Sequence, residues 1–206
     1  MLERMKRETS RSGFTYIEYA RYADDLVVLV DGYGGKWERL LKETYRKLLE
    51  ELARIAVKVN TEKTRLVDMM KRETFSFLGF DFRRMKAKSG KWTVWTTPRV
   101  KARTKLLRNL KDIFRRFVSQ PVDRVIALIN PKLRGWINYF RIGNSSVCFS
   151  YVKDWVEKKV QRHLMRARNR QGFGWNRWSR EWLYKNLGLY NDYKVRYYRP
   201  ESAASR

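Results

Sequence analysis

A change in the spacing of apolar residues near Pro98 constrains the fold of this chain most strongly. Before that point, short runs of apolar, β-branched and aromatic residues are typical of strands, with one helical pattern among them. After it, apolar residues recur every three or four positions, as in residues 99–118, which is typical of amphipathic helices. The sequence therefore predicts an α+β protein: an antiparallel sheet with a packed helix over residues 1–97, then a helical bundle over residues 98–199. We expect residues 200–206 to be a disordered tail.

The same spacing predicts where individual elements lie. The expected strands span residues 14–21, 26–30, 75–82 and 92–95, and residues 56–59 and 64–69 are also expected to be extended. The expected helices span residues 37–52, 99–118, 122–129 and 152–164, with one further short helix between Trp175 and Gly188. Asn130 and Pro131 match an N-cap followed by proline at the first helical position, which predicts that a separate helix starts there and carries Leu133 to Phe140.

Two adjacent acidic residues, Asp24 and Asp25, lie between the first two expected strands. A hairpin places their carboxylates at the tip of a rigid element, where a hard divalent cation can bind them. Mg²⁺ held by carboxylates and substrate phosphates is the common arrangement for nucleotidyl transfer. The alternative is an ordinary solvated turn, because Asp-Asp pairs also occur often by chance. The flanking strands favour the metal site.

The charge balance points to a polyanionic partner. Lys and Arg number 47 against 21 Asp and Glu, a net charge of +26, and only seven of the acids lie in residues 97–206. Such an excess destabilises the compact state unless a polyanion neutralises it. The 8 Trp and 12 Tyr among these cations favour RNA, whose unstacked bases stack on aromatic rings.

Several classes of protein are excluded by composition. No apolar run approaches the ~20 residues that a membrane-spanning helix needs. The N-terminal residues lack the apolar core of a signal peptide, so we expect a cytoplasmic location. One cysteine, Cys148, and one histidine, His163, cannot build a disulfide framework or a zinc-bound nuclease module.

Four motifs, in this order, resemble reverse transcriptases of the group II intron-encoded protein family. They are Tyr22-Ala23-Asp24-Asp25, Asn60-Thr61-Glu62-Lys63-Thr64, Phe77-Leu78-Gly79-Phe80 and Leu133-Arg134-Gly135-Trp136-Ile137-Asn138-Tyr139-Phe140. The last closely resembles the signature of that family's maturase domain, also called the thumb or domain X. The resemblance spans residues 16–199 and implies a partial polymerase palm over residues 1–97, followed by a basic thumb and maturase bundle.

The resemblance also implies roles for residues of the palm. Asp24 would be a direct Mg²⁺ ligand with Asp25 secondary, and Lys63 would approach the phosphates of the incoming nucleotide. Tyr22 and the three residues Phe77, Leu78 and Gly79 would contact the RNA–DNA primer–template. The competing interpretations are a core aromatic for Tyr22, a solvated turn for Lys63, core packing for Phe77 and Leu78, and a bulge at Gly79.

Basic side chains of the second segment would bind the intron RNA. The residues expected to do so are Lys101, Lys105, Arg108, Arg115, Arg134, Arg162 and Arg166. They could instead form an ordinary solvated surface, but the scarcity of acids argues against that reading. We expect Trp136 and Phe140 to be core residues rather than a platform for bases, and His163 to be a packed histidine.

The family's fingers, and a further metal-binding aspartate upstream of the hairpin, have no counterpart in this sequence, because only 21 residues precede Tyr22. We therefore expect the C-terminal portion of an RNA-directed DNA polymerase and maturase, inactive as a polymerase by itself. It would bind group II intron RNA to promote splicing. With a separately encoded N-terminal half, it would extend a DNA primer on an RNA template; a decayed reading frame is the other explanation. The alternative function is a non-enzymatic RNA-binding splicing factor with vestigial carboxylates.

Overall fold

The chain folds as an α+β protein, as the apolar spacing predicts. The computed structural model describes residues 2–12, 17–32, 37–60, 62–171, 174 and 176–196. Contacts divide the chain into two compact units, Met1–Phe77 and Leu78–Arg206. This division falls before the domain boundary expected near residue 97, which stays a prediction. The expected disordered tail lies outside the described residues.

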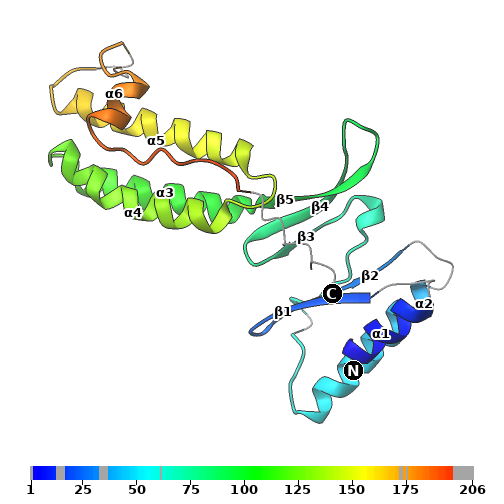
Figure 1. Ribbon diagram of the computed structural model, residues 1–206. Coiled ribbons are helices and arrows are strands. Elements are labelled where there is room, and N and C mark those ends of the chain that lie inside the picture. The colour runs from blue at the N-terminus through cyan, green and yellow to red at the C-terminus, as the bar shows by residue number, and fades with distance from the viewer. Residues whose placement is uncertain are drawn as a thin grey trace, which may run out of the picture. The chain divides into compact units, whose positions relative to one another are not determined.

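The first unit contains a β-hairpin with helices beside it (Figure 1). Its elements are α1 (Leu2–Ser12), β1 (Ile17–Tyr22), β2 (Asp25–Val30), α2 (Trp37–Arg54), the 3-10 helix η1 (Met69–Lys71) and β3 (Thr74–Phe77). The hairpin and α2 confirm the predictions, although residues 14–16 lie outside the described part of the chain. Helix α1 was not expected; it packs on β1, where Met5 and Ile17 are buried.

The strand expected over residues 75–82 is interrupted, so that prediction is wrong. Leu78 and Gly79 both have positive φ, at 48° and 79°, and this turn ends β3. β4 (Phe80–Lys86) begins directly after it and pairs antiparallel with β5 (Trp92–Pro98). The sequence hides the turn because leucine is not a typical turn residue and the apolar residues on both sides keep the period of a strand.

Three long helices form the core of the second unit: α3 (Val100–Arg116), α4 (Val122–Phe140) and α5 (Ser146–Arg166). They contact one another pairwise and run side by side (Figure 1). Helices α3 and α5 and the short α6 (Arg180–Lys185) confirm the predictions. The buried interior includes Leu106, Leu110, Val125, Ile129, Leu133, Val152, Val156, Val160 and Leu183. Among the described residues, no helix combines the length and apolar character needed to cross a membrane.

The separate helix expected to start at Asn130 is wrong, because α4 continues through Pro131. Asn130 does not cap a helix: its amide nitrogen donates to Gly188 O at 2.8 Å, and its amide oxygen accepts from Tyr190 N at 2.9 Å. The apolar stripe of α4, from Val125 to Phe140, is buried along its whole length. Burial of this stripe offsets the cost of a proline inside the helix, which is about 3 kcal/mol.

The hairpin of β4 and β5 packs on the end of α4. The ring centroids of Phe80 and Phe140 lie 4.9 Å apart, and those of Phe140 and Trp136 lie 4.6 Å apart. Trp136 and Phe140 are therefore core residues, as expected. The loop after α4 is fixed to β5 by Asn144, whose N–H donates to Thr96 O at 2.7 Å and whose Oδ1 accepts from Thr96 N at 3.1 Å.

Polar contacts, two of them with a buried carboxylate, attach α6 to α5. The Glu157 carboxylate is only 3% exposed, yet it accepts from the Tyr184 hydroxyl and lies 2.9 Å from Arg180 Nε. Arg180 also lies 2.7 Å from Asp154, so one guanidinium of α6 joins two acids of α5. His163 is buried with its Nε2 at 2.9 Å from Gln120 O, which confirms a packed histidine.

Candidate nucleic-acid interface

The two adjacent carboxylates lie at the tip of the first hairpin. Ala23 and Asp24 form the turn between β1 and β2, and Tyr22 pairs with Asp25 across it. Ala23 has a φ of 49°, a region that costs an L-residue ~1–2 kcal/mol, and its carbonyl accepts from Arg21 Nε at 3.0 Å. Asp24 and Asp25 are exposed, and neither forms an ion pair with any side chain in the described ranges. Both are therefore open to a cation.

The pair alone supplies only part of a metal site. Across the described residues, no group of three or more His, Cys, Asp or Glu side chains could hold a metal ion. Mg²⁺ is usually bound by one or two carboxylates together with waters and substrate phosphates. Asp24 and Asp25 fit that donor set when the phosphates come from a bound nucleotide.

The other residues expected in the palm occupy different places. Tyr22 is 65% exposed and so is not a core residue of its unit. Lys63 is exposed in a turn whose backbone N–H bonds to Asn60, and it pairs with neither aspartate. Leu78 O accepts from a tyrosine of α4, and Gly79 packs against the ring of Phe140. Contacts of Tyr22, Lys63 and the residues Phe77 to Gly79 with a primer–template or nucleotide stay predictions.

Helix α3 presents a row of cations to solvent. The four expected residues are Lys101, Lys105, Arg108 and Arg115, and all four are exposed. Their spacing of four, three and seven residues places them on one side of the helix. Arg108 and Arg115 form no ion pair with any described residue. A row of this kind can contact successive phosphates of a nucleic-acid backbone.

Helices α3 and α5 bring further cations together around Lys159. Partial burial lowers the pKa of the Lys159 ammonium, and nearby positive charges lower it further. These charges belong to Arg162, Lys111 and Arg166. The Lys159 nitrogen also lies 5.3 Å from the ring centroid of Trp155. Like charges held this close repel one another, and a bound polyanion would relieve that repulsion.

Sequence reasoning found Arg162 and Arg166 but missed Lys111 and Lys159. The packing of α3 on α5, which brings these residues together, is not visible in either helix alone. The three-residue spacing from Lys159 to Arg162 was the available signal, because it places both on one face of α5.

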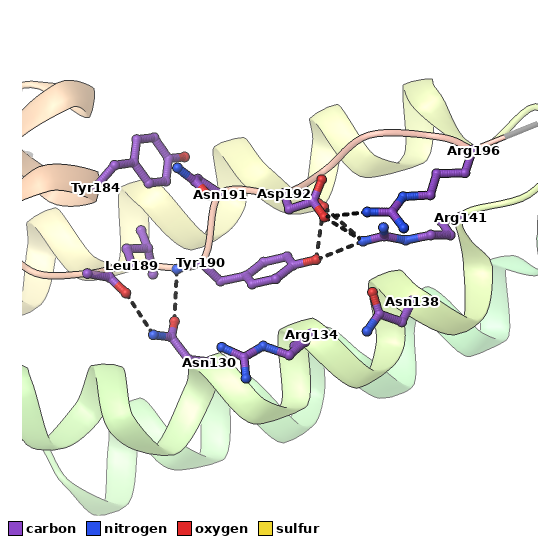
Figure 2. A pocket seen from close by; sticks show the side chains of 11 residues that line it. Asn130, Arg134, Asn138, Arg141, Tyr184, Leu189, Tyr190, Asn191, Asp192 and Arg196 are labelled. Carbon is purple, nitrogen blue, oxygen red and sulfur yellow. Dashed lines mark hydrogen bonds and ion pairs between the residues drawn. The ribbon is translucent and has the colours of Figure 1, made fainter.

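A polar pocket lies between α4 and residues 188–196 (Figure 2). These residues run along the helix as an extended segment, here called the strap. The volume of the pocket is about 610 Å³. The lining residues are Asn130, Arg134, Asn138, Arg141, Tyr184, Gly188, Leu189, Tyr190, Asn191, Asp192 and Arg196. Arg134 is exposed and, of the residues expected to bind RNA, it is the one that lines this pocket. The strap residues were not expected from sequence.

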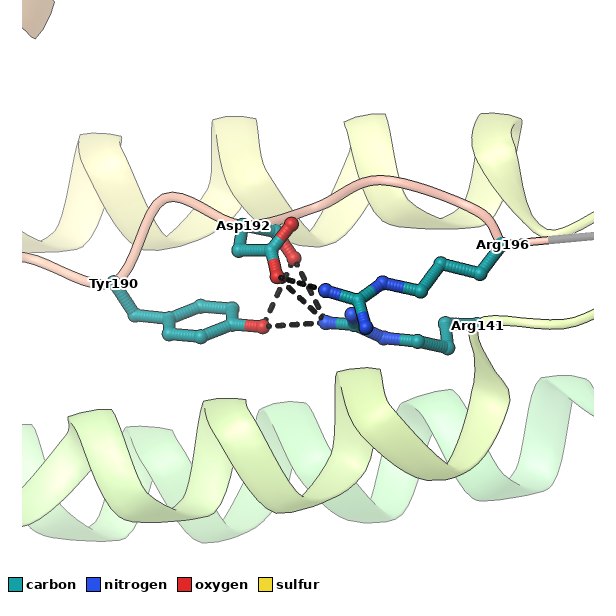
Figure 3. Close-up of polar contacts among 4 residues, drawn as sticks. All are labelled: Arg141, Tyr190, Asp192 and Arg196. Atoms are coloured by element: carbon teal, nitrogen blue, oxygen red, sulfur yellow. Dashed lines mark hydrogen bonds and ion pairs between the residues drawn. The ribbon is translucent and has the colours of Figure 1, made fainter.

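An ion pair fixes the strap on α4. Arg141 lies 2.9 Å from the Asp192 carboxylate and 3.2 Å from the Tyr190 hydroxyl, and Arg196 lies 3.8 Å from the same carboxylate (Figure 3). The hydrogen bond and charge of Arg141 lower the pKa of the Asp192 carboxyl. Arg196 N also donates to Arg141 O at 2.7 Å. The strap is therefore held by its backbone and by its side chains.

Comparison with known proteins places the helical region in a family. Residues 103–182 match the family described as "Group II intron, maturase-specific domain". This range starts within α3, includes α4 and α5, and ends within α6. A search of curated proteins found no match. Residues 103–182 are therefore similar to a group II intron maturase-specific domain, and the predicted resemblance to the group II intron-encoded maturase family is confirmed for this region.

Proposed function

We propose that this chain binds group II intron RNA through the cations of α3 and α5 and promotes splicing of that RNA. The observation that carries the proposal is the match of residues 103–182 to the maturase-specific domain, together with the cations on those helices. Splicing needs the intron to fold into its active form, and a protein that binds the folded RNA more tightly than unfolded states shifts the population toward it.

The row of cations on α3 (Lys101, Lys105, Arg108 and Arg115) binds the phosphates of the RNA electrostatically. Each Lys or Arg that neutralises a phosphate releases counterions when RNA binds. The logarithm of the binding constant therefore falls linearly with the logarithm of the salt concentration, and each contact adds about 0.7–0.9 to the steepness of this line, here called the salt slope. Removing two such contacts should therefore reduce the salt slope by about 1.5. For variants that remove these two charges, loss of affinity without loss of slope would instead indicate a damaged fold.

The test compares two double variants that remove equal charge. Arg108→Gln/Arg115→Gln changes the exposed row on α3, and Arg39→Gln/Lys42→Gln changes exposed cations of α2 in the other unit. Binding of fluorescent group II intron transcripts is measured over a salt series, and splicing of a precursor transcript is followed in parallel. We expect the α3 variant to lose salt slope and splicing and the α2 variant to keep both. Equal effects of the two variants would refute the proposal.

We propose a second function, Mg²⁺-dependent extension of a DNA primer on an RNA template, carried out jointly with a separately encoded N-terminal reverse transcriptase half. The observation that favours it is the pair of exposed carboxylates without ion pairs beside the positive φ of Ala23. Asp24 and Asp25 would hold the cation against the phosphates of the nucleotide. When bound, Mg²⁺ stabilises charge that develops on the transferred phosphate.

Primer extension tests this second function. The wild-type chain and Asp24→Asn/Asp25→Asn are each assayed on a primed RNA template, with and without an added N-terminal half from a related enzyme. We expect extension only from the wild-type chain with the added half. Extension by the double variant, or none by either mixture, would remove the polymerase proposal. Unchanged splicing by the double variant would then favour a splicing factor with vestigial carboxylates.

A further inference from the structure

We infer that the pocket between α4 and the strap holds one unstacked nucleotide of the bound RNA. This inference rests on the proposed binding of intron RNA, and it adds a second mode of contact to the cation row on α3. RNA is commonly recognised where single nucleotides leave the stack, because their base edges and faces are then accessible to side chains. The pocket offers groups suited to both parts of a nucleotide.

The pocket is large enough and already formed. Its volume of about 610 Å³ lies within the range of ~300–1,000 Å³ that is usual for sites of small ligands. Both hydrogen bonds of the Asn130 amide hold the backbone of Gly188 and Tyr190 at one end. The contacts of Arg141 with Asp192 and Arg196 hold the other end (Figure 3). A ligand would not have to order these walls, which favours affinity.

Charge in the pocket suits a phosphate. Asp192 lies 2.9 Å from Arg141 and neutralises it, so Arg141 supports the wall. Arg134 forms no ion pair with any residue of the described ranges, and Arg196 reaches Asp192 only at 3.8 Å. The guanidinium groups of Arg134 on α4 and Arg196 on the strap are therefore both available to bind one anionic group. Arginine is well suited to this role because its planar fork can bind phosphate through two hydrogen bonds.

The pocket also has groups that can recognise a base. Asn138 lies one helical turn after Arg134 on α4, and Asn191 lies on the strap (Figure 2). Both asparagines are exposed, and their side chains form no hydrogen bond with the described part of the chain. An amide both donates and accepts, as a base edge does. The rings of Tyr184 and Tyr190 supply apolar surface beside them.

The test separates single-stranded from paired RNA. Fluorescent single-stranded octanucleotides and fully paired duplexes of equal length are titrated with the full chain and with Asn138→Ala and Arg134→Lys. The matched control is Asn109→Ala, which removes an exposed asparagine from the interior of α3. Arg134→Lys keeps the charge but removes the fork of donors. Urea unfolding of each variant establishes that it is folded.

We expect Asn138→Ala and Arg134→Lys each to weaken single-strand binding about tenfold while duplex binding changes less than twofold, because only an unstacked nucleotide can reach these side chains. The salt slope of Arg134→Lys should stay that of the wild type. Asn109→Ala should change neither affinity. Equal losses for single strands and duplexes would overturn the inference.

Competition identifies the source of the nucleotide. AMP, GMP, CMP, UMP and inorganic phosphate are added to the labelled octanucleotide. Weak competition by at least one monophosphate that disappears in Asn138→Ala supports a nucleotide subsite for RNA. A monophosphate that binds as tightly as the octanucleotide would make this a free-nucleotide site and overturn the assignment to RNA. If pocket variants bind normally while Arg108→Gln/Arg115→Gln does not, the pocket inference fails and the proposed function stands.

Discussion

Replacement of Gly143 by alanine should destabilise the helical unit more than a matched change in the β4–β5 loop. Gly143 lies in the loop after α4 with a φ of 68°. A Cβ atom there would lie 2.6 Å from Thr96 O and 2.9 Å from Thr96 Cβ, closer than atoms can approach without movement. The first obstacle is backbone of β5, so a change of rotamer cannot relieve it.

The magnitude has two parts. A left-handed φ costs an alanine about 1–2 kcal/mol. Moving the loop away from β5 also strains or breaks the two hydrogen bonds between Asn144 and Thr96, each worth about 0.5–1.5 kcal/mol. We therefore expect Gly143→Ala to lower the free energy of unfolding by about 2–4 kcal/mol. This is a large share of the ~5–15 kcal/mol that stabilises a typical protein.

Gly90→Ala is the matched control. Gly90 has a φ of 81°, but no atom lies within 4 Å of the position that its Cβ would take. Gly90→Ala should therefore lower the free energy of unfolding by only the cost of a left-handed φ, about 1–2 kcal/mol. Urea unfolding followed by far-UV circular dichroism measures both variants, and hydrogen exchange at Asn144 N reports the contact with Thr96. If Gly143→Ala is no less stable than Gly90→Ala, the close approach of loop and strand is refuted.

Three other changes test smaller parts of the structure. Ala23→Gly should raise the stability of the first unit by about 0.5–1 kcal/mol in urea unfolding, because glycine adopts a positive φ without strain. The hydrogen bond from Arg141 lowers the pKa of Asp192 below its ordinary 3.8. Since that pKa is lower in the folded than in the unfolded chain, the stabilisation is complete above the unfolded pKa and is lost as the pH falls through the folded one. Asp192→Asn should therefore flatten the acid side of a plot of unfolding midpoint against pH. Burial raises the pKa of the Cys148 thiol, so a disulfide reagent at mildly alkaline pH should react faster with the urea-unfolded chain than with the folded one.

Local sequence patterns predicted those elements whose formation depends on near neighbours. α2, α3 and α5 each keep an apolar stripe over several turns, which predicts a helix without knowledge of its partner. The first hairpin was predicted from two apolar strands with a short polar connection. In the second unit, sequence patterns predicted α6 but not the strap that follows it.

The errors arose where distant residues decide the outcome. Asn130 and Pro131 have the local pattern of a helix start, but the Asn130 amide bonds to backbone 58 and 60 residues later, and α4 remains continuous. A short window cannot reveal that competing partner. Leu78 adopts a φ of 48°, which its residue type does not suggest.

The candidate site divides in the same way. The cations of α3 were predictable because their spacing on one helix defines a common face. The cluster of Lys111 with Lys159, and the pocket that Asn138 shares with Asn191, need contacts between separate elements. Arg134 was found only through its motif; its place beside the strap was not predictable.

The few acids of residues 97–206 are placed so that they stabilise a strongly basic bundle and leave its α3 cations available for the proposed RNA. Only seven acids lie in residues 97–206, and four of the six that the structure describes form ion pairs. Asp154 and Glu157 bind Arg180 of α6, and Asp192 of the strap binds Arg141. These acids thus hold α6 and the strap in place. Within the described residues they form no ion pairs with the cations of α3, whose charge they do not neutralise. The division separates two demands: acids stabilise the unit where the chain folds back on itself, and phosphates of RNA would neutralise the remaining charge.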